Sequence, residues 1–407
     1  MSDIMKELAR KIINETLKHL RPERLVLEKL KNFNLKEVYV LSIGKAAWRM
    51  AYAVSNVLDV RYGIVITKYG HSFGRIDNFD IFEAGHPIPD ENSIKYTKIA
   101  LDYFSKLKKN DILLLLISGG GSSLFEYLED GVTLEFLKSI TSELLKKGAS
   151  IDEINILRKR LSKVKGGKLT RLIQAKIIAL VLSDVLGDKL EYIASGPVYP
   201  DYTTFNQVKR IVKKYKLKLG ENIWNVLKKS VKLEKNVPHY IVGNIDLACK
   251  KLKMVAEKYG FNTFLLTTRL NCEARDAGKF VASIVKGINS FPKPYCVVFG
   301  GETVVKVKGN GMGGRNQELS FAAALEIEGI ENVVIASVGT DGTDGPTDAA
   351  GGIVDGNTVK ILRERGYSPE EFLINNDTYN GLKEAESLLI TGPTGTNLND
   401  IGFVLVR

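Results

Sequence analysis

The chain has 407 residues, and at about 150 residues per domain this length predicts two domains. Its composition, with 44% hydrophobic and 26% charged residues, 37 glycines and 11 prolines, excludes a disordered, fibrous or coiled-coil protein. The net charge of +11 is compatible with a nucleic-acid partner, an anionic substrate or a lysine-rich solvated surface.

The N-terminal segment is expected to form a helix. Its first twenty residues place Asp3, Glu7 and Glu15 among apolar positions, which is typical of an amphipathic helix and not of a signal peptide. The longest apolar runs, 112–117 and 177–182, hold six residues each, far fewer than the roughly 20 needed to cross a bilayer. We therefore predict a cytoplasmic protein with no membrane partner.

Short apolar runs alternate with helical patterns along the rest of the chain. Several runs are apolar on both faces, as in parallel sheets covered by helices, which predicts the α/β class. The predicted strands are 38–43, 64–67, 81–84, 113–117, 177–182, 240–242, 263–266, 296–299, 333–337, 388–390 and 403–406.

The polar, lysine-rich stretch 228–238 separates two series of strands and helices. We predict one α/β domain over residues 1–235 with a mostly parallel sheet. A second domain follows over residues 236–407. Hairpin-like patterns over 300–314 and 391–406 predict a mixed sheet there.

Cysteines and basic residues narrow the choice of partner. Cys249, Cys272 and Cys296 are odd in number and widely spaced, so we expect core thiols and neither disulfides nor a metal knuckle. The basic residues lie on predicted helix faces without interleaved aromatic residues, which argues against nucleic acid. Small anions remain the favoured ligands.

Candidate anion-binding residues follow the strands at 38–43 and 113–117. Lys45 places a cation beside the backbone N–H groups of a strand-to-helix turn, although an exposed loop lysine is the alternative. Three consecutive glycines and two serines form the second turn, where bare backbone and hydroxyl groups can approach a phosphate or carboxylate closely. The residues expected to bind substrate or nucleotide here are Ser42, Gly44, Gly119, Gly120, Gly121, Ser122 and Ser123.

Acidic residues follow two further strands. Asp184 and Asp188 follow the strand at 177–182, and Asp341, Asp344 and Asp348 follow the strand at 333–337. Aspartate and glycine also build turns for local reasons. Packed this closely after a buried strand, some of these carboxylates are expected to hold a divalent cation, since Mg²⁺ takes one or two carboxylates together with substrate phosphates.

The string from Gly309 to Gly314 formally matches the dinucleotide motif GxGxxG and precedes a predicted helix that begins at Arg315. The match is weak, because the strand before it alternates like a hairpin arm. An NAD-dependent oxidoreductase therefore stays an alternative. Glycine turns, the cations Lys45 and Arg315, and carboxylates for a metal are together the components of phosphoryl transfer.

Eight strings resemble, in order, the glycerate 2-kinases of the MOFRL type. They cover nearly the whole chain from about residue 38, and their order makes the resemblance far more specific than any one string. The strings are GKAA, GHPIPDENS, ISGGGSSL, LRKRLSKVKGGKL, LSDVLGDKLEYIASGPVYPD, GGETVVKVKGNGMGGRNQE, TDGTDGPTDAAGG and TGPTGTNLND.

The resemblance implies an N-terminal Rossmann-like α/β domain and a C-terminal MOFRL domain. Because the motifs are divided between both halves, we expect the active site in the cleft between the two domains. It also implies ATP-dependent phosphorylation of D-glycerate at the 2-hydroxyl, with Mg²⁺ or another divalent cation. Five residues match family positions implicated in binding or catalysis: Lys45, Glu302, Arg315, Asp341 and Asn397. We expect Lys45 and Arg315 to be catalytic and Asp341 and Glu302 to hold the metal. The other residues expected to bind substrate or nucleotide are Asp184, Asp188, Gly311, Gly313, Gly314 and Asn397.

Some roles stay open at this point. Asp184 and Asp188 are candidates for the general base, His86 could serve catalysis or a rigid turn, and Arg158 and Lys163 could bind anions or form structural ion pairs. A non-catalytic nucleotide or metabolite sensor on the same fold is the second alternative to a kinase. The predicted partners are D-glycerate and ATP, and the sequence leaves a homodimer open.

Overall fold

The computed structural model describes residues 2–229, 236–287 and 291–407. These residues form two compact units, each with its own sheet. The parallel-sheet unit comprises Pro22–Val242, and the mixed-sheet unit combines the chain up to Arg21 with Gly243–Arg407. No helix among the described residues is long and apolar enough to span a membrane.

The parallel-sheet unit contains a six-stranded sheet in the order β3-β2-β1-β4-β5-β6. The pairs β1–β2, β1–β4, β2–β3 and β4–β5 are all parallel. The strands are β1 (Glu37–Ile43), β2 (Asp59–Lys68), β3 (Phe79–Ala84), β4 (Ile112–Ile117), β5 (Lys176–Leu182) and β6 (His239–Gly243). The predicted Rossmann-like α/β fold is confirmed, because this strand order reverses direction between β1 and β4.

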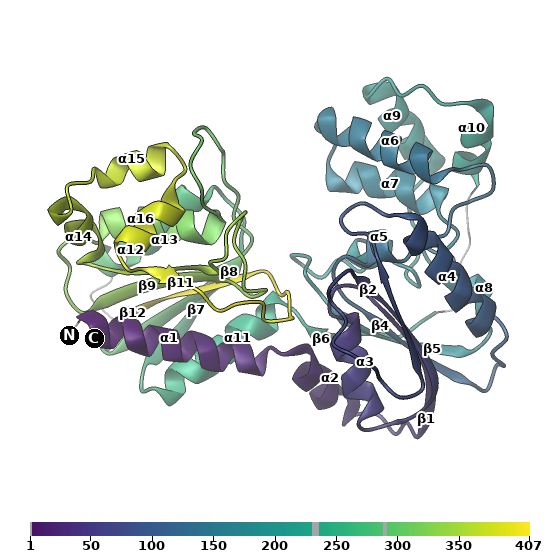
Figure 1. The fold of residues 1–407 in the computed structure, drawn as a ribbon, viewed down its shortest axis with the longest axis horizontal. Coiled ribbons are helices and arrows are strands. Elements are labelled where there is room, and N and C mark those ends of the chain that lie inside the picture. Colours follow the sequence, from purple (N-terminus) through teal and green to yellow (C-terminus); the bar gives the residue numbers. More distant parts are fainter. Residues whose placement is uncertain (1, 230–235, 288–290) are drawn as a thin grey trace. The chain divides into compact units, whose positions relative to one another are not determined.

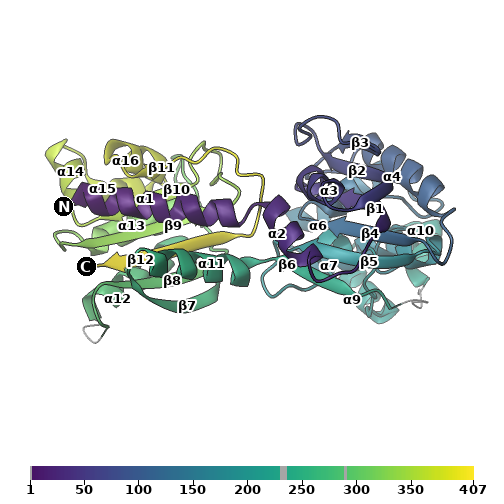
Figure 2. The ribbon, with the colours of Figure 1, turned by 90° about the horizontal axis from the view of Figure 1, so that it is seen from below.

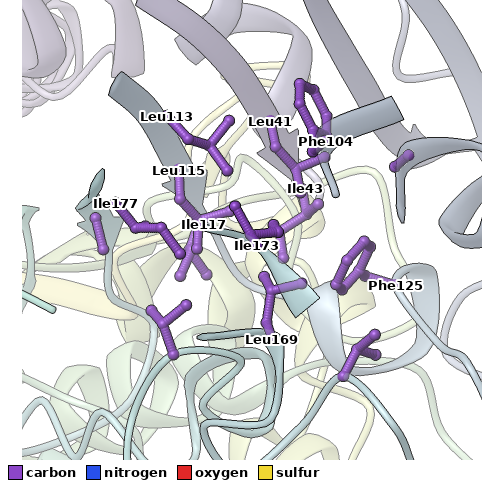
Figure 3. Close-up of a cluster of buried hydrophobic side chains, with 14 of the residues drawn as sticks. Leu41, Ile43, Phe104, Leu113, Leu115, Ile117, Phe125, Leu169, Ile173 and Ile177 are labelled. Carbon is purple, nitrogen blue, oxygen red and sulfur yellow. The ribbon is translucent and has the colours of Figure 1, made fainter. Parts of the chain in front are cut away.

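Both faces of this sheet are buried, which explains its continuous apolar strands. Figure 3 shows one face, where Leu41, Ile43, Leu115 and Ile117 pack with Phe104 and other apolar side chains. The helices are α2 (Pro22–Leu30), α3 (Ala47–Ser55), α4 (Glu91–Phe104), α5 (Gly121–Leu124), α6 (Leu134–Lys146), α7 (Ile151–Leu161), α8 (Leu169–Leu172), α9 (Phe205–Lys214), α10 (Glu221–Lys228) and a 3₁₀ turn, Ile193–Ser195. Helices α6, α7, α9 and α10 surround a separate apolar cluster.

The mixed-sheet unit has six strands in the order β11-β10-β9-β12-β8-β7. Only β7–β8 is parallel, and the other four pairs are antiparallel, so the predicted mixed sheet is confirmed. The strands are β7 (Asn262–Leu270), β8 (Tyr295–Gly301), β9 (Val333–Gly339), β10 (Gly351–Asp355), β11 (Leu388–Leu389) and β12 (Asp400–Val406).

Helices cover both faces of the mixed sheet (Figure 1). Helices α1 (Ser2–His19) and α11 (Ile245–Lys258) lie side by side on one face, as Figure 2 shows. Helix α13 packs on the opposite face beside α12 and α16. The remaining helices are α12 (Ala274–Gly287), α13 (Arg315–Glu326), α14 (Thr358–Glu364), α15 (Pro369–Ile374) and α16 (Thr378–Glu384).

The division of the chain differs from the predicted domains 1–235 and 236–407. Helix α1 joins the mixed-sheet unit, because its apolar stripe of Ala9, Ile12 and Ile13 is buried there and Lys6 forms an ion pair with Asp355 at 3.5 Å. The second boundary falls between Val242 and Gly243. Part of the predicted linker, residues 230–235, lies outside the described residues.

All eleven predicted strands are present, but three details were wrong. Residues 303–308 form no hairpin arm and make only an isolated bridge between Val304 and Glu273. Strands β11 and β12 are not neighbours, because β10 and β9 lie between them. Cys249 and Cys296 are buried as expected, whereas Cys272 is exposed.

Candidate active site

Three acidic residues lie along one edge of the mixed sheet. Strand β12 begins at Asp400, whose register partners are Gly301 at the end of β8 and Gly339 at the end of β9. Glu302 directly follows β8, and Asp341 lies just beyond β9. Because β12 runs antiparallel to both neighbours, its first residue lies beside their last residues. Segments that are far apart in the sequence thus supply one group of carboxylates.

Arg315, the first residue of α13, is the cation of this edge. Its Nε donates to Asp400 Oδ2 at 2.6 Å, its Nη2 to Asp400 Oδ1 at 3.1 Å, and its Nη1 to Glu302 Oε1 at 2.9 Å. Burial opposes the charge, but Asp400 and Glu302 raise the pKa of Arg315, so the guanidinium stays cationic. The bidentate pair fixes its plane. One third of the Arg315 side chain stays exposed (33%) and can meet a ligand.

Two backbone donors at the start of α13 are already engaged within the protein, contrary to the expectation of free donors beside Arg315 at a helix N-terminus. Asp344 accepts hydrogen bonds from the backbone N–H groups of Asn316 (3.1 Å) and Gln317 (2.9 Å), and also from their side-chain amides. Burial raises the pKa of the Asp344 carboxyl, and these donors oppose the rise. A carboxylate of the protein itself thus takes two of the donors at the helix start, and the guanidinium is the charged group left to face an anion.

A cavity of about 710 Å³ opens beside Arg315. This volume lies in the range of small-molecule sites, about 300–1,000 Å³. Part of its lining is charged and part is aliphatic. The lining residues are Thr303, Val304, Val305, Val307, Gly311, Gly313, Gly314, Arg315, Glu318, Asp341, Thr343, Asp344, Gly345, Pro346 and Asn376.

The glycines predicted to bind nucleotide line this cavity, but a packing requirement explains them. A Cβ on Gly311 would lie 2.4 Å from Asp377 Cβ, and one on Gly313 would lie 2.4 Å from Thr378 Oγ1. A Cβ on Gly314 would lie 2.3 Å from Asp344 Cγ. The GxGxxG match therefore reflects close contact with other parts of the unit and does not follow a parallel strand as a dinucleotide motif does.

The two predicted metal ligands differ in whether a carboxylate oxygen is left without a hydrogen-bond donor. Glu302 accepts from Arg315 and, at 3.2 Å, from Asn399 Nδ2, so both its oxygens are engaged. Asp341 accepts from Thr343 N at 3.0 Å through Oδ1, and its Oδ2 has no hydrogen-bond donor among the described residues. Within the same residues no group of three His, Cys, Asp or Glu side chains is arranged to hold a metal. Asp341 is thus the carboxylate available for a cation.

Asn397, the last predicted residue of this edge, lies in the loop before β12. Its Oδ1 accepts from Asn399 N at 3.3 Å, while Asn399 contacts Glu302. The structure therefore places Asn397 near the edge and gives it a role in shaping the turn.

In the parallel-sheet unit, the turn after β1 is built differently from the prediction. Ser42 is fully buried and its hydroxyl donates to the Ala47 carbonyl at 2.8 Å, so it cannot contact a ligand. The N–H of Gly44 donates to Ile66 O, and the N–H of Lys45 donates to Gly119 O. The expected free N–H groups of this turn are already used by neighbouring strand ends. Only the Lys45 side chain remains for an anion.

Lys45 is an uncommitted cation. Its side chain is half-buried, and its ammonium forms no hydrogen bond or ion pair with any residue that the structure describes. It lies against the glycine turn, since its Cγ would be 3.2 Å from a Cβ on Gly120. This position fits the predicted anion-binding role.

The triple-glycine turn after β4 meets the prediction more closely. Gly120 has φ +86°, the left-handed conformation that favours glycine. Throughout the described residues, the N–H groups of Gly119 and Gly120 have no acceptor. The neighbouring hydroxyls are engaged within the protein: Ser122 Oγ contacts Ser195 Oγ at 2.9 Å, and Ser123 Oγ donates to Gly120 O. Two backbone donors beside Lys45 can therefore bind carboxylate or phosphate oxygens.

Two further side chains approach this turn. Asp184 Oδ2 would lie 1.9 Å from a Cβ on Gly119, and His86 Cδ2 would lie 2.9 Å from a Cβ on Gly120. Burial and the charge of Lys45 lower the pKa of His86 to about 4, so its imidazole is neutral at pH 7. Asp188 lies farther along its loop, at φ 53°. Of the two predicted acids, Asp184 is the one that contacts the turn.

The basic string 157–169 serves the structure, as one of its two predicted roles implied. Arg158 Nη2 donates to Ser122 O at 3.2 Å, and Lys163 forms an ion pair with Asp130 at 2.6 Å. Neither cation lies against the glycine N–H groups in these contacts.

The Gly44→Ala variant tests whether the close packing around Gly44 requires glycine at this position. Gly44 has φ +118°, and a Cβ there would lie 2.2 Å from Ser118 Oγ and 2.5 Å from the Ser118 carbonyl. We expect the free energy of unfolding to fall by about 3–5 kcal/mol, measured by denaturant titration. Gly70→Ala is the matched control, since its φ is +74° with open space around it, and should lose only about 1–2 kcal/mol. Equal losses in the two variants would contradict this account.

Sequence reasoning missed the partners of Arg315. Asp400 was not predicted, although an acid directly before the apolar run 401–406 was a visible signal. Asn399 and the capping role of Asp344 also escaped prediction, because their contacts join segments separated by 97 and 28 residues.

The fold and site together define a two-unit α/β enzyme that acts on anionic substrates. Two family models match the chain: the domain of unknown function DUF4147 over residues 8–228 and the MOFRL family over residues 295–400. The chain belongs to the family of MOFRL-type glycerate 2-kinases.

Relatives along the full length support this membership. A D-glycerate 2-kinase of Thermotoga maritima is 52% identical, covering 99% of this chain and 98% of the relative. A glycerate 2-kinase of Pyrococcus horikoshii is 43% identical, covering 99% of this chain and 97% of the relative. A relative from Agrobacterium vitis, 36% identical over 90% and 98%, carries a provisional name as a hydroxypyruvate reductase. The crystal structure of a glycerate kinase from Thermotoga maritima superposes with a TM-score of 0.97 at 51% identity, covering 100% of both chains.

Proposed function

We propose that this protein transfers the γ-phosphoryl group of ATP to the 2-hydroxyl of D-glycerate, giving 2-phosphoglycerate and ADP. The observation that carries the proposal is the guanidinium of Arg315, held by two carboxylates beside a cavity large enough for a nucleotide. Full-length similarity to proteins named glycerate 2-kinase supports the choice of acceptor.

The parallel-sheet unit supplies the means to bind an anion. Lys45 and the free N–H groups of Gly119 and Gly120 give one full charge and two backbone donors at the carboxyl end of the sheet, where open α/β sheets bind ligands. We assign these groups to carboxylate or phosphoryl oxygens of the substrates. Asp184, which lies against the same turn, is our candidate for accepting the proton of the 2-hydroxyl.

The mixed-sheet unit supplies the guanidinium for the transferred group. Nε of Arg315 is engaged, whereas each of its two terminal nitrogens has a second N–H beyond its contact with Asp400 or Glu302. These N–H groups can stabilise charge that spreads over the phosphoryl oxygens in the transition state. The sequence-based expectation of a cleft shared by both domains stays a prediction, as does the homodimer.

A charge argument supports the divalent cation. Arg315 is the only cation in direct contact with Asp400 and Glu302 among the described residues, and Asp341 adds a third carboxylate to the edge. An incoming triphosphate would meet net negative charge here. Asp341 is the residue we assign to Mg²⁺, which would offset the charge of the phosphates and hold them in place.

Chelation by EDTA is expected to abolish turnover, and added Mg²⁺ should restore it. Asp341→Asn should raise the Mg²⁺ concentration needed for half-maximal rate, because an amide binds the cation more weakly than a carboxylate. Asp348→Asn is the matched control, since Asp348 is exposed and bonded to Tyr379. Full activity of the metal-free enzyme would refute the assignment.

Product analysis tests the proposed function directly. Incubation with D-glycerate and ATP should yield 2-phosphoglycerate, identified by NMR, together with ADP in equal amount. A reaction without acceptor measures background ATP hydrolysis. Oxidation of NADH with hydroxypyruvate, tested in parallel, would favour the oxidoreductase alternative, and formation of 3-phosphoglycerate alone would overturn the assigned position.

A further inference from the structure

The aliphatic part of the cavity lining is exposed at two of its three valines. Val304 and Val307 line the cavity and expose 58% and 71% of their surface. Val305, between them, is half-buried and packs against the apolar core. We call Val304, Val305 and Val307 the valine wall.

The loop that carries the valine wall is fixed at both ends. Val304 N donates to Cys272 O at 3.1 Å, and Ala274 N donates to Val304 O at 2.8 Å. Farther along, Lys308 N donates to Asn376 Oδ1 at 2.8 Å, and Gly311 N donates to Asn375 O at 2.9 Å. The valines are therefore held beside the cavity by backbone hydrogen bonds on either side. A preformed apolar surface of this kind is typical of a ligand site.

We propose that the valine wall binds the purine base of ATP, an inference that rests on the proposed function. Of the two substrates, glycerate is a small polar anion without an apolar face to cover valines, whereas a purine presents two flat apolar faces. The cavity of about 710 Å³ also exceeds what glycerate needs. Arg315 and Asp341 line the same cavity, so one nucleotide can place its phosphates against the charged groups and its base against the valines.

Calorimetric binding of ADP and of inorganic tripolyphosphate tests this inference. The double variant Val304→Ala/Val307→Ala removes most of the exposed apolar surface and leaves the charged groups in place. We expect its Kd for ADP to rise about tenfold, while the Kd for tripolyphosphate, which has no base, stays within about twofold of wild type. In steady-state assays the KM for ATP should rise and the KM for D-glycerate should not.

Val57→Ala is the matched control, because Val57 is 53% exposed in the other unit. Unchanged ADP binding by the double variant would overturn the inference, and so would equal weakening of ADP and tripolyphosphate, which would indicate a damaged loop. A rise in KM for D-glycerate alone would instead assign the wall to the acceptor and also overturn it. If the valine substitutions weakened ADP binding but the wild type formed no phosphoglycerate, the proposed function would be wrong and the inference of a base-binding site would hold.

Discussion

Arg315→Ala is expected to lower kcat by about 10³-fold or more, with a smaller effect on KM for ATP. The guanidinium is already oriented by Asp400 and Glu302, so its N–H groups need no rearrangement as charge develops on the transferred phosphoryl group. Arg315→Lys should recover only part of the rate, because an ammonium keeps the charge but loses the planar fork. Steady-state kinetics of both variants measure this.

The same substitution should also destabilise the fold, which calls for a second variant. Removing Arg315 leaves Asp400, only 7% exposed, without its partner, and such a loss costs about 3–5 kcal/mol. In the double variant Arg315→Ala/Asp400→Asn position 400 carries no charge that lacks a partner, so stability should largely return while kcat stays low. Recovery of kcat along with stability would remove Arg315 from the catalytic residues. Glu318, one turn along α13, accepts a hydrogen bond from Arg275 and therefore does not replace Asp400 or Glu302 as a partner of Arg315.

Stability of the Arg315→Ala variant should also depend on pH in a defined direction. Burial raises the pKa of Asp400 to about 7 although Arg315 opposes the rise, so removing the guanidinium should raise this pKa further above its unfolded value. The folded state then binds more protons than the unfolded state, so stability falls as pH rises through the unfolded pKa toward the folded one. Melting curves at several pH values, compared with Arg315→Ala/Asp400→Asn, should show this slope only in the single variant.

Lys45→Ala is expected to lower kcat/KM by about 10²–10³-fold while the melting temperature stays close to wild type. The ammonium has no partner among the described residues, so its removal leaves no buried group unpaired, but it removes the charge beside the free N–H groups of the glycine turn. Kinetics and thermal unfolding of the same preparation measure both effects.

Lys176→Ala provides the control for Lys45→Ala, since it removes the same charge from an exposed position at the start of β5. Its activity should match wild type. If Lys45→Ala melted far below wild type and its folded fraction were fully active, Lys45 would have a structural role in the turn.

Burial made most of the fold predictable. Strands such as β4 and β5 are covered on both faces, so their apolar runs stand out in the sequence. Strand β10 escaped because it begins with Gly351 and Gly352, where a Cβ on Gly351 would lie 1.9 Å from Ser337 O. The backbone approaches too closely there for larger residues, and the apolar signal of the strand is lost.

The predicted site shows where local patterns stop being informative. The turn at Ser42, Gly44 and Lys45 seemed to offer free N–H groups, but Ile66 and Gly119, from neighbouring strand ends, accept them. The pairing of Arg315 with Asp400 spans 85 residues and no local pattern encodes it. The triple-glycine turn was predictable because its free donors follow from its own backbone conformation.

The placement of α1 has a consequence for biosynthesis. Among the described residues, α1 packs mainly on α11, β9 and β10, so during synthesis the helix leaves the ribosome 221 residues before the segment that covers it begins at Gly243. At about 5–20 residues per second, that interval is on the order of 10–40 s. In that time Pro22–Val242, whose core needs no later residues, can fold completely. The nascent chain thus carries an uncovered amphipathic helix beside a folded domain until the C-terminal strands have been synthesised.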